Sequence, residues 1–172
     1  FERLEFKNWL KKLNGDTEKE PEDIDAPPAS LQGDYQTILT RQVFDAWMER
    51  LQQAELFGFD TETTSLDYMQ ARIVGLSFAV EPGKAAYLPV AHDYPGAPDQ
   101  LDRDWVLEQL KPLLEDPQRA KLGHHLKYDR NVLLNHGIRL RGIAYDSMLE
   151  SYLLDSTASR HDLDSLCRKY LD

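Results

Sequence analysis

An apolar stretch that ends in two carboxylates is the feature that most constrains this chain. Residues 57–63 read Phe-Gly-Phe-Asp-Thr-Glu-Thr, so a predicted strand runs directly into Asp60 and Glu62. Side chains alternate between the two faces of a strand, and these two acids therefore project from one face while Thr61 points away. Two neighbouring carboxylates repel each other unless a cation lies between them, and hard divalent cations prefer such oxygen ligands. The pattern indicates metal-dependent cleavage of a phosphodiester as the first hypothesis.

Composition limits the class of protein. With 172 residues, 41% of them hydrophobic and 29% charged, the chain is expected to form one domain with a proper core, plus appendages. No apolar run is long enough to cross a bilayer, and the first residues do not read as a signal peptide. The single cysteine, Cys167, cannot form an internal disulfide, and its place in a helical pattern predicts a core residue. We therefore expect a soluble, cytoplasmic protein without a membrane partner.

The net charge of −10 restricts how the chain could bind nucleic acid. Residues 35–172 carry 21 acidic and 15 basic residues, a net charge of −6, without the basic stripe that gives non-specific affinity for duplex DNA. Affinity would have to come from bound metals, base stacking and a few hydrogen-bond donors. A short single-stranded end suits these interactions better than a long duplex does.

The chain divides into three segments. Residues 1–13 predict a short amphipathic helix, which is too short to be stable alone. Residues 14–34 hold seven acidic residues and three prolines, and they predict a flexible linker that adds nothing to a core. Residues 35–172 predict a compact domain. Because such linkers join domains, the chain reads as a piece of a multidomain protein.

Apolar periodicity and turn residues within 35–172 predict an α/β fold, a mixed sheet flanked by helices. Strands are expected at 56–61, 73–80, 85–90, 120–124 and 140–144, the second and third forming an antiparallel hairpin. Helices are expected after the caps Thr40 and Asp102, from 127 to Gly137, and at 146–154 and 162–171. Asp146 reads as a helix cap rather than a ligand. The last two helices are expected to turn their apolar residues inward: Met148, Leu149, Tyr152, Leu153, Leu163, Leu166 and Tyr170.

A third carboxylate, Asp129, lies one turn into the helix that follows the strand 120–124. If that strand is a neighbour of the strand 56–61, Asp129 leans over the end of the sheet towards Asp60 and Glu62. Three carboxylates around one point would hold two metal ions about 3.5–4 Å apart, an arrangement that stabilises the attacking and leaving oxygens of an in-line displacement. The histidines and Cys167 lack the spacing of a zinc site.

Two motifs carry a resemblance to a known family. Residues 59–63 and 126–130 resemble the first and second motifs of the DEDD-type 3'→5' exonucleases, and 74–80, 88–94 and 141–152 resemble the proofreading exonuclease domain of bacterial DNA polymerase I. The likeness covers about residues 35–172 and implies a ribonuclease H-like fold. Residues 1–13 resemble the tail of the preceding 5'-nuclease domain in that family, and 14–34 the linker that follows it.

The resemblance also implies roles for single residues. Asp60, Glu62 and Asp129 correspond to the catalytic carboxylates that bind Mg²⁺ or Mn²⁺, two ions in a complete domain. The positions that correspond to contacts with the 3'-terminal DNA are Thr63, Leu66, His124, His125, Tyr128 and Arg160; relatives commonly carry amides in place of the two histidines. The family's third motif, a tyrosine followed four residues later by a fourth aspartate, does not occur in the 172 residues. We therefore expect this chain alone to be nearly inactive.

The implied activity is two-metal hydrolysis of the 3'-terminal phosphodiester of DNA during replication and repair. The implied partners are a frayed or single-stranded 3' end of DNA and a polymerase domain of the same parent chain. Two alternatives stay open. One is an RNA 3'-exonuclease of the ribonuclease D type, which shares both carboxylate motifs, and the other is a non-catalytic module that only binds DNA.

Overall fold

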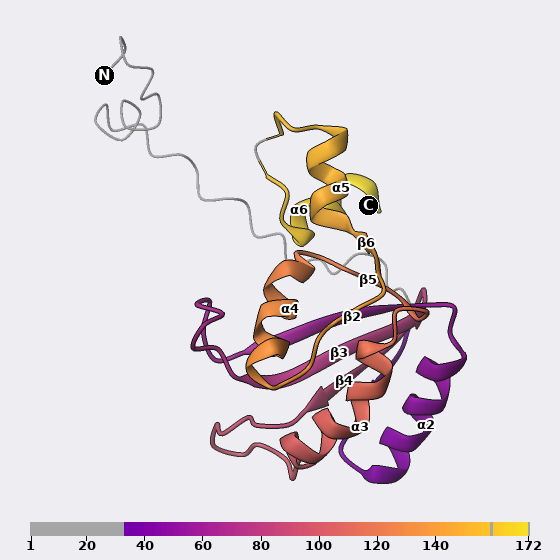
Figure 1. The fold of residues 1–172 in the computed structure, drawn as a ribbon, viewed down its shortest axis with the longest axis vertical. Helices are drawn as coiled ribbons and strands as arrows, with labels where there is room; N and C mark the ends of the chain where they lie inside the picture. The colour runs from indigo at the N-terminus through magenta and orange to yellow at the C-terminus, as the bar shows by residue number, and fades with distance from the viewer. Residues whose placement is uncertain (1–32, 159, 172) are drawn as a thin grey trace. The chain divides into compact units, whose positions relative to one another are not determined.

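The computed structural model describes residues 33–158 and 160–171 (Figure 1). The helix predicted at 1–13 lies outside the described residues, and so does the linker predicted at 14–34 except for its last two positions. Within the described residues, six strands, whose bounds follow below, form one sheet in the order β1-β4-β3-β2-β5-β6. β1 pairs with β4, β2 with β5 and β5 with β6 in parallel, whereas β3 is antiparallel to both β2 and β4. The predicted mixed sheet is therefore confirmed.

The strands follow the sequence pattern with two differences. They span Asp34–Thr37 (β1), Leu56–Thr63 (β2), Ile73–Glu81 (β3), Lys84–Pro89 (β4), Ala120–Gly123 (β5) and Ile143–Asp146 (β6). β1 was not predicted, because its polar sequence has no alternation and only pairing with β4 makes it a strand. The strand predicted at 140–144 begins later. Gly142 has a φ of 70° beside the carbonyl of Arg119, a left-handed turn that a strand cannot include.

The helices begin at side chains that satisfy their first backbone N–H groups. They span Arg41–Gln53 (α2), Arg103–Glu115 (α3), Leu126–Asn135 (α4), Ser147–Leu154 (α5) and Leu163–Tyr170 (α6). The side chains of Thr40, Asp102, Asp146 and Asp162 accept hydrogen bonds from the first turns of α2, α3, α5 and α6, respectively. The predicted caps are thus confirmed. Among the helices that the structure describes, only α4 starts without a side-chain cap of its own.

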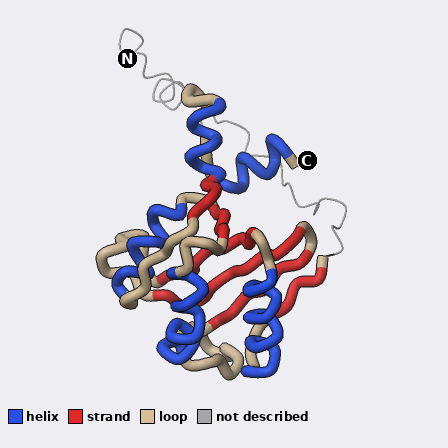
Figure 2. The backbone as a smooth tube through the Cα atoms, turned by 45° about the vertical axis from the view of Figure 1, so that its right-hand side comes forward, coloured by secondary structure: helices blue, strands red, loops and turns tan. Residues whose placement is uncertain are grey.

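One face of the sheet carries the core. A single cluster of buried residues joins α2, α3 and α4 to the inward side chains of the strands, among them Phe57 and Phe59 of β2. Figure 2 shows these helices packed along the strands. The opposite face of β2 presents Gly58, Asp60 and Glu62, which are more exposed than their neighbours. The alternation along β2 therefore separates a core face from an open face that carries the two acids.

The last two helices do not bury their apolar residues as predicted. The exposed fractions of Leu149, Tyr152, Leu153, Leu163 and Tyr170 range from 48% to 87%. Only Ser151 of α5 and Leu166 of α6 are buried, and Cys167 is half-buried rather than in the core. The reason is that α5 contacts α6 and β6 rather than the core face of the sheet.

Among the described helices, none combines the length and the apolar character that crossing a bilayer requires.

Candidate active site

Asp60 and Glu62 lie on the open face, close to the end of β2. Their partners across the strand pair are Ser77 and Gly75 of β3. Thr61 lies between them in sequence, but its side chain is 7% exposed and points to the core face. Both partners on β3 have a small side chain or none, and a hollow on this face is lined by Asp60 and Ser77.

Asp129 is brought to this strand by the parallel pairing of β2 with β5. Helix α4 follows β5 after a short connection, so its first turns lie against β2. The Asp129 side chain is 2% exposed, and its Oδ1 accepts hydrogen bonds from the backbone N–H of Thr61 at 3.0 Å and from the Thr61 hydroxyl at 2.5 Å. The structure thus places Asp129 against the residue between the two acids, on the core side of β2.

The three carboxylates influence one another electrostatically. Burial and, after it, the negative charges of Asp129 and Glu62 together raise the pKa of Asp60 to about 6, although a hydrogen bond from the Thr61 backbone opposes them. Burial also raises the pKa of Asp129, against the hydrogen bonds from Thr61. None of the ion pairs found among the described residues includes these acids. The site therefore carries negative charge that its own side chains do not neutralise.

This donor set fits a hard divalent cation in its chemistry, since carboxylate oxygens are the ligands that Mg²⁺ and Mn²⁺ prefer. The raised pKa of Asp60, caused by burial and by two acids, is the signature of a site that lacks a positive charge. The side chains are not gathered as a finished coordination shell. Within residues 33–158 and 160–171, no group of three or more Asp, Glu, His or Cys side chains stands ready to hold one ion.

The start of α4 is fixed by Asp146. Its carboxylate accepts hydrogen bonds from the backbone N–H groups of His125 at 3.1 Å and Leu126 at 2.9 Å, and it also caps α5 through Met148 and Leu149. His125 takes a left-handed conformation with φ of 61° at this point. The sequence predicted the cap on α5 but not the second role, which positions the helix that carries Asp129.

The two predicted histidine contacts lie at the same end of α4. His124 shares a 3.0 Å hydrogen bond between its Nδ1 and the Ser147 hydroxyl, and burial lowers its pKa. His125 is exposed. His124 also lines a hollow of about 370 Å³ on the open face, together with Asp60, Phe78 and Leu163. Sequence reasoning missed this hollow, because residues from β2, β3, β5 and α6 form it together.

Three further predicted residues meet at the loop after β2. The Tyr128 hydroxyl donates to the Ser65 carbonyl and shares a 2.6 Å hydrogen bond with the Thr63 hydroxyl. Leu66, at the tip of this loop, is 96% exposed. Asn135 of α4 also holds the loop, donating to the Tyr68 carbonyl at 2.6 Å.

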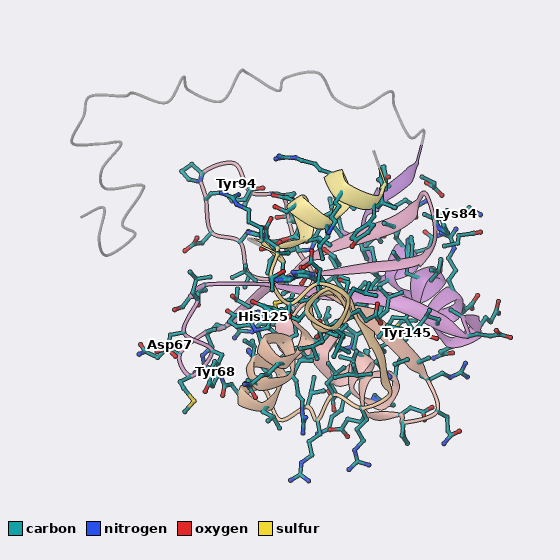
Figure 3. All side chains as sticks on the ribbon, turned by 90° about the horizontal axis from the view of Figure 1, so that it is seen from above. Asp67, Tyr68, Lys84, Tyr94, His125 and Tyr145 are labelled. Atoms are coloured by element: carbon teal, nitrogen blue, oxygen red, sulfur yellow. The ribbon has the colours of Figure 1, made fainter. Side chains whose placement is uncertain are left out.

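Figure 3 labels Asp67 and Tyr68 on this projecting loop and His125 on the same side of the domain. Arg160 is exposed in the segment before α6, and the hydrogen bonds and ion pairs of the described residues do not join it to the other predicted contacts. The hydrogen bonds therefore join Thr63 and Tyr128 at the loop that carries Leu66, and none among the described residues joins Arg160 to this loop.

Comparison with known proteins gives a consistent result. A family model described as a 3'-5' exonuclease matches residues 35–172. The DNA polymerase I of Pseudomonas aeruginosa is 57% identical over 174 residues, which cover 99% of this chain and 19% of that protein. The chain thus spans about a fifth of the length of this relative.

Two solved structures share the fold. The POL domain of Pol1 from M. smegmatis, in complex with a DNA primer-template and dNTP, superposes with a TM-score of 0.61 at 22% identity, over 79% of this chain and 22% of that one. NrnC of Brucella melitensis with bound Mg²⁺ superposes with a TM-score of 0.56 at 20% identity, over 83% of this chain and 63% of that one. At this level of identity the likeness concerns the fold alone. The predicted ribonuclease H-like class of α/β fold is confirmed.

Proposed function

The chain belongs to the family of 3'-5' exonuclease domains of DNA polymerase I, and on that premise we propose that it serves to remove nucleotides from the 3' end of DNA by metal-dependent hydrolysis. One observation carries the proposal. Asp129 is hydrogen-bonded to Thr61, which lies directly between Asp60 and Glu62 in sequence, so helix α4 supplies a third acid next to the part of β2 that carries the other two. Grouped acids with a raised pKa at Asp60, caused by burial and by the other two, are typical of functional sites.

The proposed ligands of Mg²⁺ or Mn²⁺ are Asp60, Glu62 and Asp129, with two ions in a complete domain. Such ions lower the pKa of a bound water to near neutral and stabilise charge on the leaving 3'-oxygen. The side chains of this chain orient the proposed ligands. Thr61 orients Asp129 through two hydrogen bonds. Asp60 loses its proton when an ion binds, so protons compete with the ion increasingly as the pH falls below about 6.

The loop after β2 is the proposed contact for the terminal nucleotide. Leu66 is almost fully exposed, although the loop that carries it is anchored by Tyr128 and Asn135. An exposed apolar side chain on an anchored loop suits contact with an unpaired base. Thr63 would lie beside the terminal nucleotide, and His124, His125 and Arg160 would contact the single strand. Because a mispaired terminus frays more easily, selection against errors can follow from the cost of melting the duplex end.

The wider setting is part of the proposal. The relatives are DNA polymerases of which this chain covers about a fifth or less. We accordingly propose that the domain works beside a polymerase domain in one parent chain, in the cytoplasm, during DNA replication and repair. The proposed DNA partner is a frayed or single-stranded 3' end. The expected low activity of the 172 residues alone stays a prediction.

An RNA 3'-exonuclease is the second candidate, because the RNase domain of the yeast Pop2 protein shares the fold, with a TM-score of 0.64 at 12% identity. Digestion of DNA and RNA strands of matched sequence separates the two candidates. We expect faster release of mononucleotides from the DNA strand. Faster release from RNA would favour the alternative.

The site itself is tested with the domain inside a full-length polymerase chain, by release of mononucleotides from a labelled single-stranded DNA in Mg²⁺. Asp60→Asn and Asp129→Asn are expected to lower the rate by at least about 100-fold. The matched control is Asp162→Asn, an exposed cap of α6 at which asparagine works as well as aspartate. Unchanged rates in the first two variants would reject the site. If the unmodified chain itself released no mononucleotides, the remaining candidate would be the module that only binds DNA.

A further inference from the structure

Tyr87 lies beside the proposed site, although nothing above assigns it a role. Its neighbours in β4, Ala86 and Leu88, are buried on the core face, so the Tyr87 side chain projects onto the open face with Asp60 and Glu62. Its hydroxyl shares a 2.5 Å hydrogen bond with Nε2 of His92, a residue in the loop after β4. The pair joins the open face of the sheet to that loop.

Because Gly75 has no side chain, the Tyr87 ring can lie over it. It pairs directly with Glu62, so a side chain at position 75 would stand on the open face next to the Glu62 carboxylate. A Cβ atom at Gly75 would overlap the hydroxyl and the ring of Tyr87. The tyrosine therefore occupies the space that the glycine leaves empty, and its hydroxyl reaches the neighbourhood of Glu62 for that reason.

His92 is itself held firmly. Gln100 accepts a hydrogen bond from the His92 backbone N–H at 2.9 Å and donates one to the His92 carbonyl at 2.8 Å. The imidazole lies between two aromatic rings, with ring centroids 5.9 Å from Tyr87 and 5.8 Å from Tyr94. Figure 3 labels Tyr94 in the loop that follows β4. The histidine thus has a fixed orientation towards the Tyr87 hydroxyl.

The hydrogen bond between Tyr87 and His92 can run in either direction, depending on the tautomer of His92, and the negative charge near Tyr87 favours one of the two. Burial, followed by the negative charge of Glu62 and the nearby Tyr94, raises the pKa of Tyr87. A neutral phenol near a carboxylate is stabilised when its O–H points towards that carboxylate. The Tyr87 oxygen then accepts from His92, which requires the proton of the imidazole on Nε2.

We propose that Tyr87 and His92 are positioning residues for Glu62: Nε2–H of His92 donates to the Tyr87 oxygen, and the Tyr87 hydroxyl is thereby free to donate towards the Glu62 carboxylate and to fix its orientation. The inference deepens the proposed function and rests on it, in that Glu62 is taken as a metal ligand. A carboxylate held in one orientation loses less freedom when a cation binds.

The first test determines the tautomer of His92 in the metal-free chain. Nitrogen-15 NMR of the imidazole reports which ring nitrogen of His92 carries the proton. We expect the Nε2–H form in the unmodified chain and a change of the His92 ring signals in Glu62→Gln. An Nδ1–H form would overturn the inference, because the Tyr87 hydroxyl would then donate its hydrogen bond to Nε2 of His92 and not towards Glu62. This result does not depend on metal binding or on nuclease activity.

The second test measures the affinity of the chain for Mn²⁺. Tyr87→Phe removes only the hydroxyl, and Gly75→Ala keeps the hydroxyl but forces the ring away, so both are expected to weaken binding about tenfold. The matched control is Gly58→Ala on the same face of the sheet, where the new Cβ would meet Ala79 at an ordinary 3.4 Å. It should change the affinity less than about twofold.

The outcomes separate the two proposals. If Glu62→Gln binds Mn²⁺ as well as the unmodified chain does, the proposed metal site is wrong, and the tautomer of His92 alone decides the inference. If Glu62→Gln weakens binding but Tyr87→Phe and Gly75→Ala do not, the metal site stands and the positioning role is rejected. Thermal unfolding of each variant confirms that the compared chains are folded.

Discussion

Thr61 holds Asp129 by two hydrogen bonds to the same carboxylate oxygen, across 68 residues of sequence. One bond comes from the backbone and one from the hydroxyl, and both lie in a buried environment. The residue whose side chain points away from the two acids of β2 is therefore the one that secures the third acid.

We expect Thr61→Val to destabilise the folded domain by about 1–3 kcal/mol, the cost of removing one hydrogen bond from a buried carboxylate. The shape of the side chain and the backbone bond are retained. The pKa of Asp129 should rise further, because the hydroxyl bond that lowers it is lost. Urea unfolding in metal-free buffer measures the change. Thr37→Val, on the exposed strand β1, is the control, and equal losses in the two variants would contradict a special role for Thr61.

Asp146→Ala should cost about 2–4 kcal/mol, because four backbone N–H groups from two helices lose their acceptor. Asp162→Ala removes an exposed cap of a single helix and should cost only about 1 kcal/mol. Chemical unfolding of the two variants and of the unmodified chain measures both differences in free energy. Similar costs for the two variants would mean that the bonds to His125 and Leu126 contribute nothing to stability.

Stability should rise with pH between about 8 and 10 because of Lys121. This side chain is fully buried, its Nζ donates to the carbonyls of Asp116 and Arg119, and burial lowers its pKa from the ordinary 10.5 to about 8. The folded chain loses the Lys121 proton near pH 8, whereas the unfolded chain keeps it until about pH 10.5. Because the unfolded state binds more protons in that window, the free energy of unfolding increases with pH there, by up to about 3 kcal/mol.

The measurement is the difference in unfolding free energy between the unmodified chain and Lys121→Met at pH 7.5, 9 and 10. Groups common to both chains, such as Tyr87, cancel in that difference. The exposed Lys127→Met provides the control, and its difference should stay flat. A flat difference for Lys121→Met as well would show that the buried lysine keeps an ordinary pKa.

Leu66→Ser should leave the unfolding free energy within about 0.5 kcal/mol of the unmodified chain, since the side chain is 96% exposed. If Leu66 contacts the terminal base, the same change should weaken binding of a short single-stranded DNA about tenfold, through lost apolar contact. Fluorescence anisotropy of a labelled oligonucleotide measures the affinity. Leu153→Ser, a comparably exposed leucine on α5, should leave it unchanged. Equal affinities for the two variants would remove Leu66 from the binding site.

The local patterns of the sequence predicted most elements of the domain, because each depends on residues close together in the chain. The hairpin of β3 and β4 was predicted from two apolar runs around a Pro-Gly turn, and the structure has it. β1 could not be predicted, since its strand conformation comes from pairing with β4, some fifty residues later in the chain. The exposed apolar residues of α5 and α6 were misread for the same reason. Helical periodicity marks an apolar face but does not say what covers it.

For the site, the sequence by itself determined that Asp60 and Glu62 share one face of a strand, because the period of two is a property of the extended backbone. It also determined the helix caps, which involve neighbouring residues. Tertiary structure alone decided that Asp129 binds Thr61, that Asp146 secures α4 as well as α5, and that Tyr87 fills the space over Gly75. These relations join residues that lie far apart in the chain or on different strands. They depend on strand order and register, which no local pattern contains.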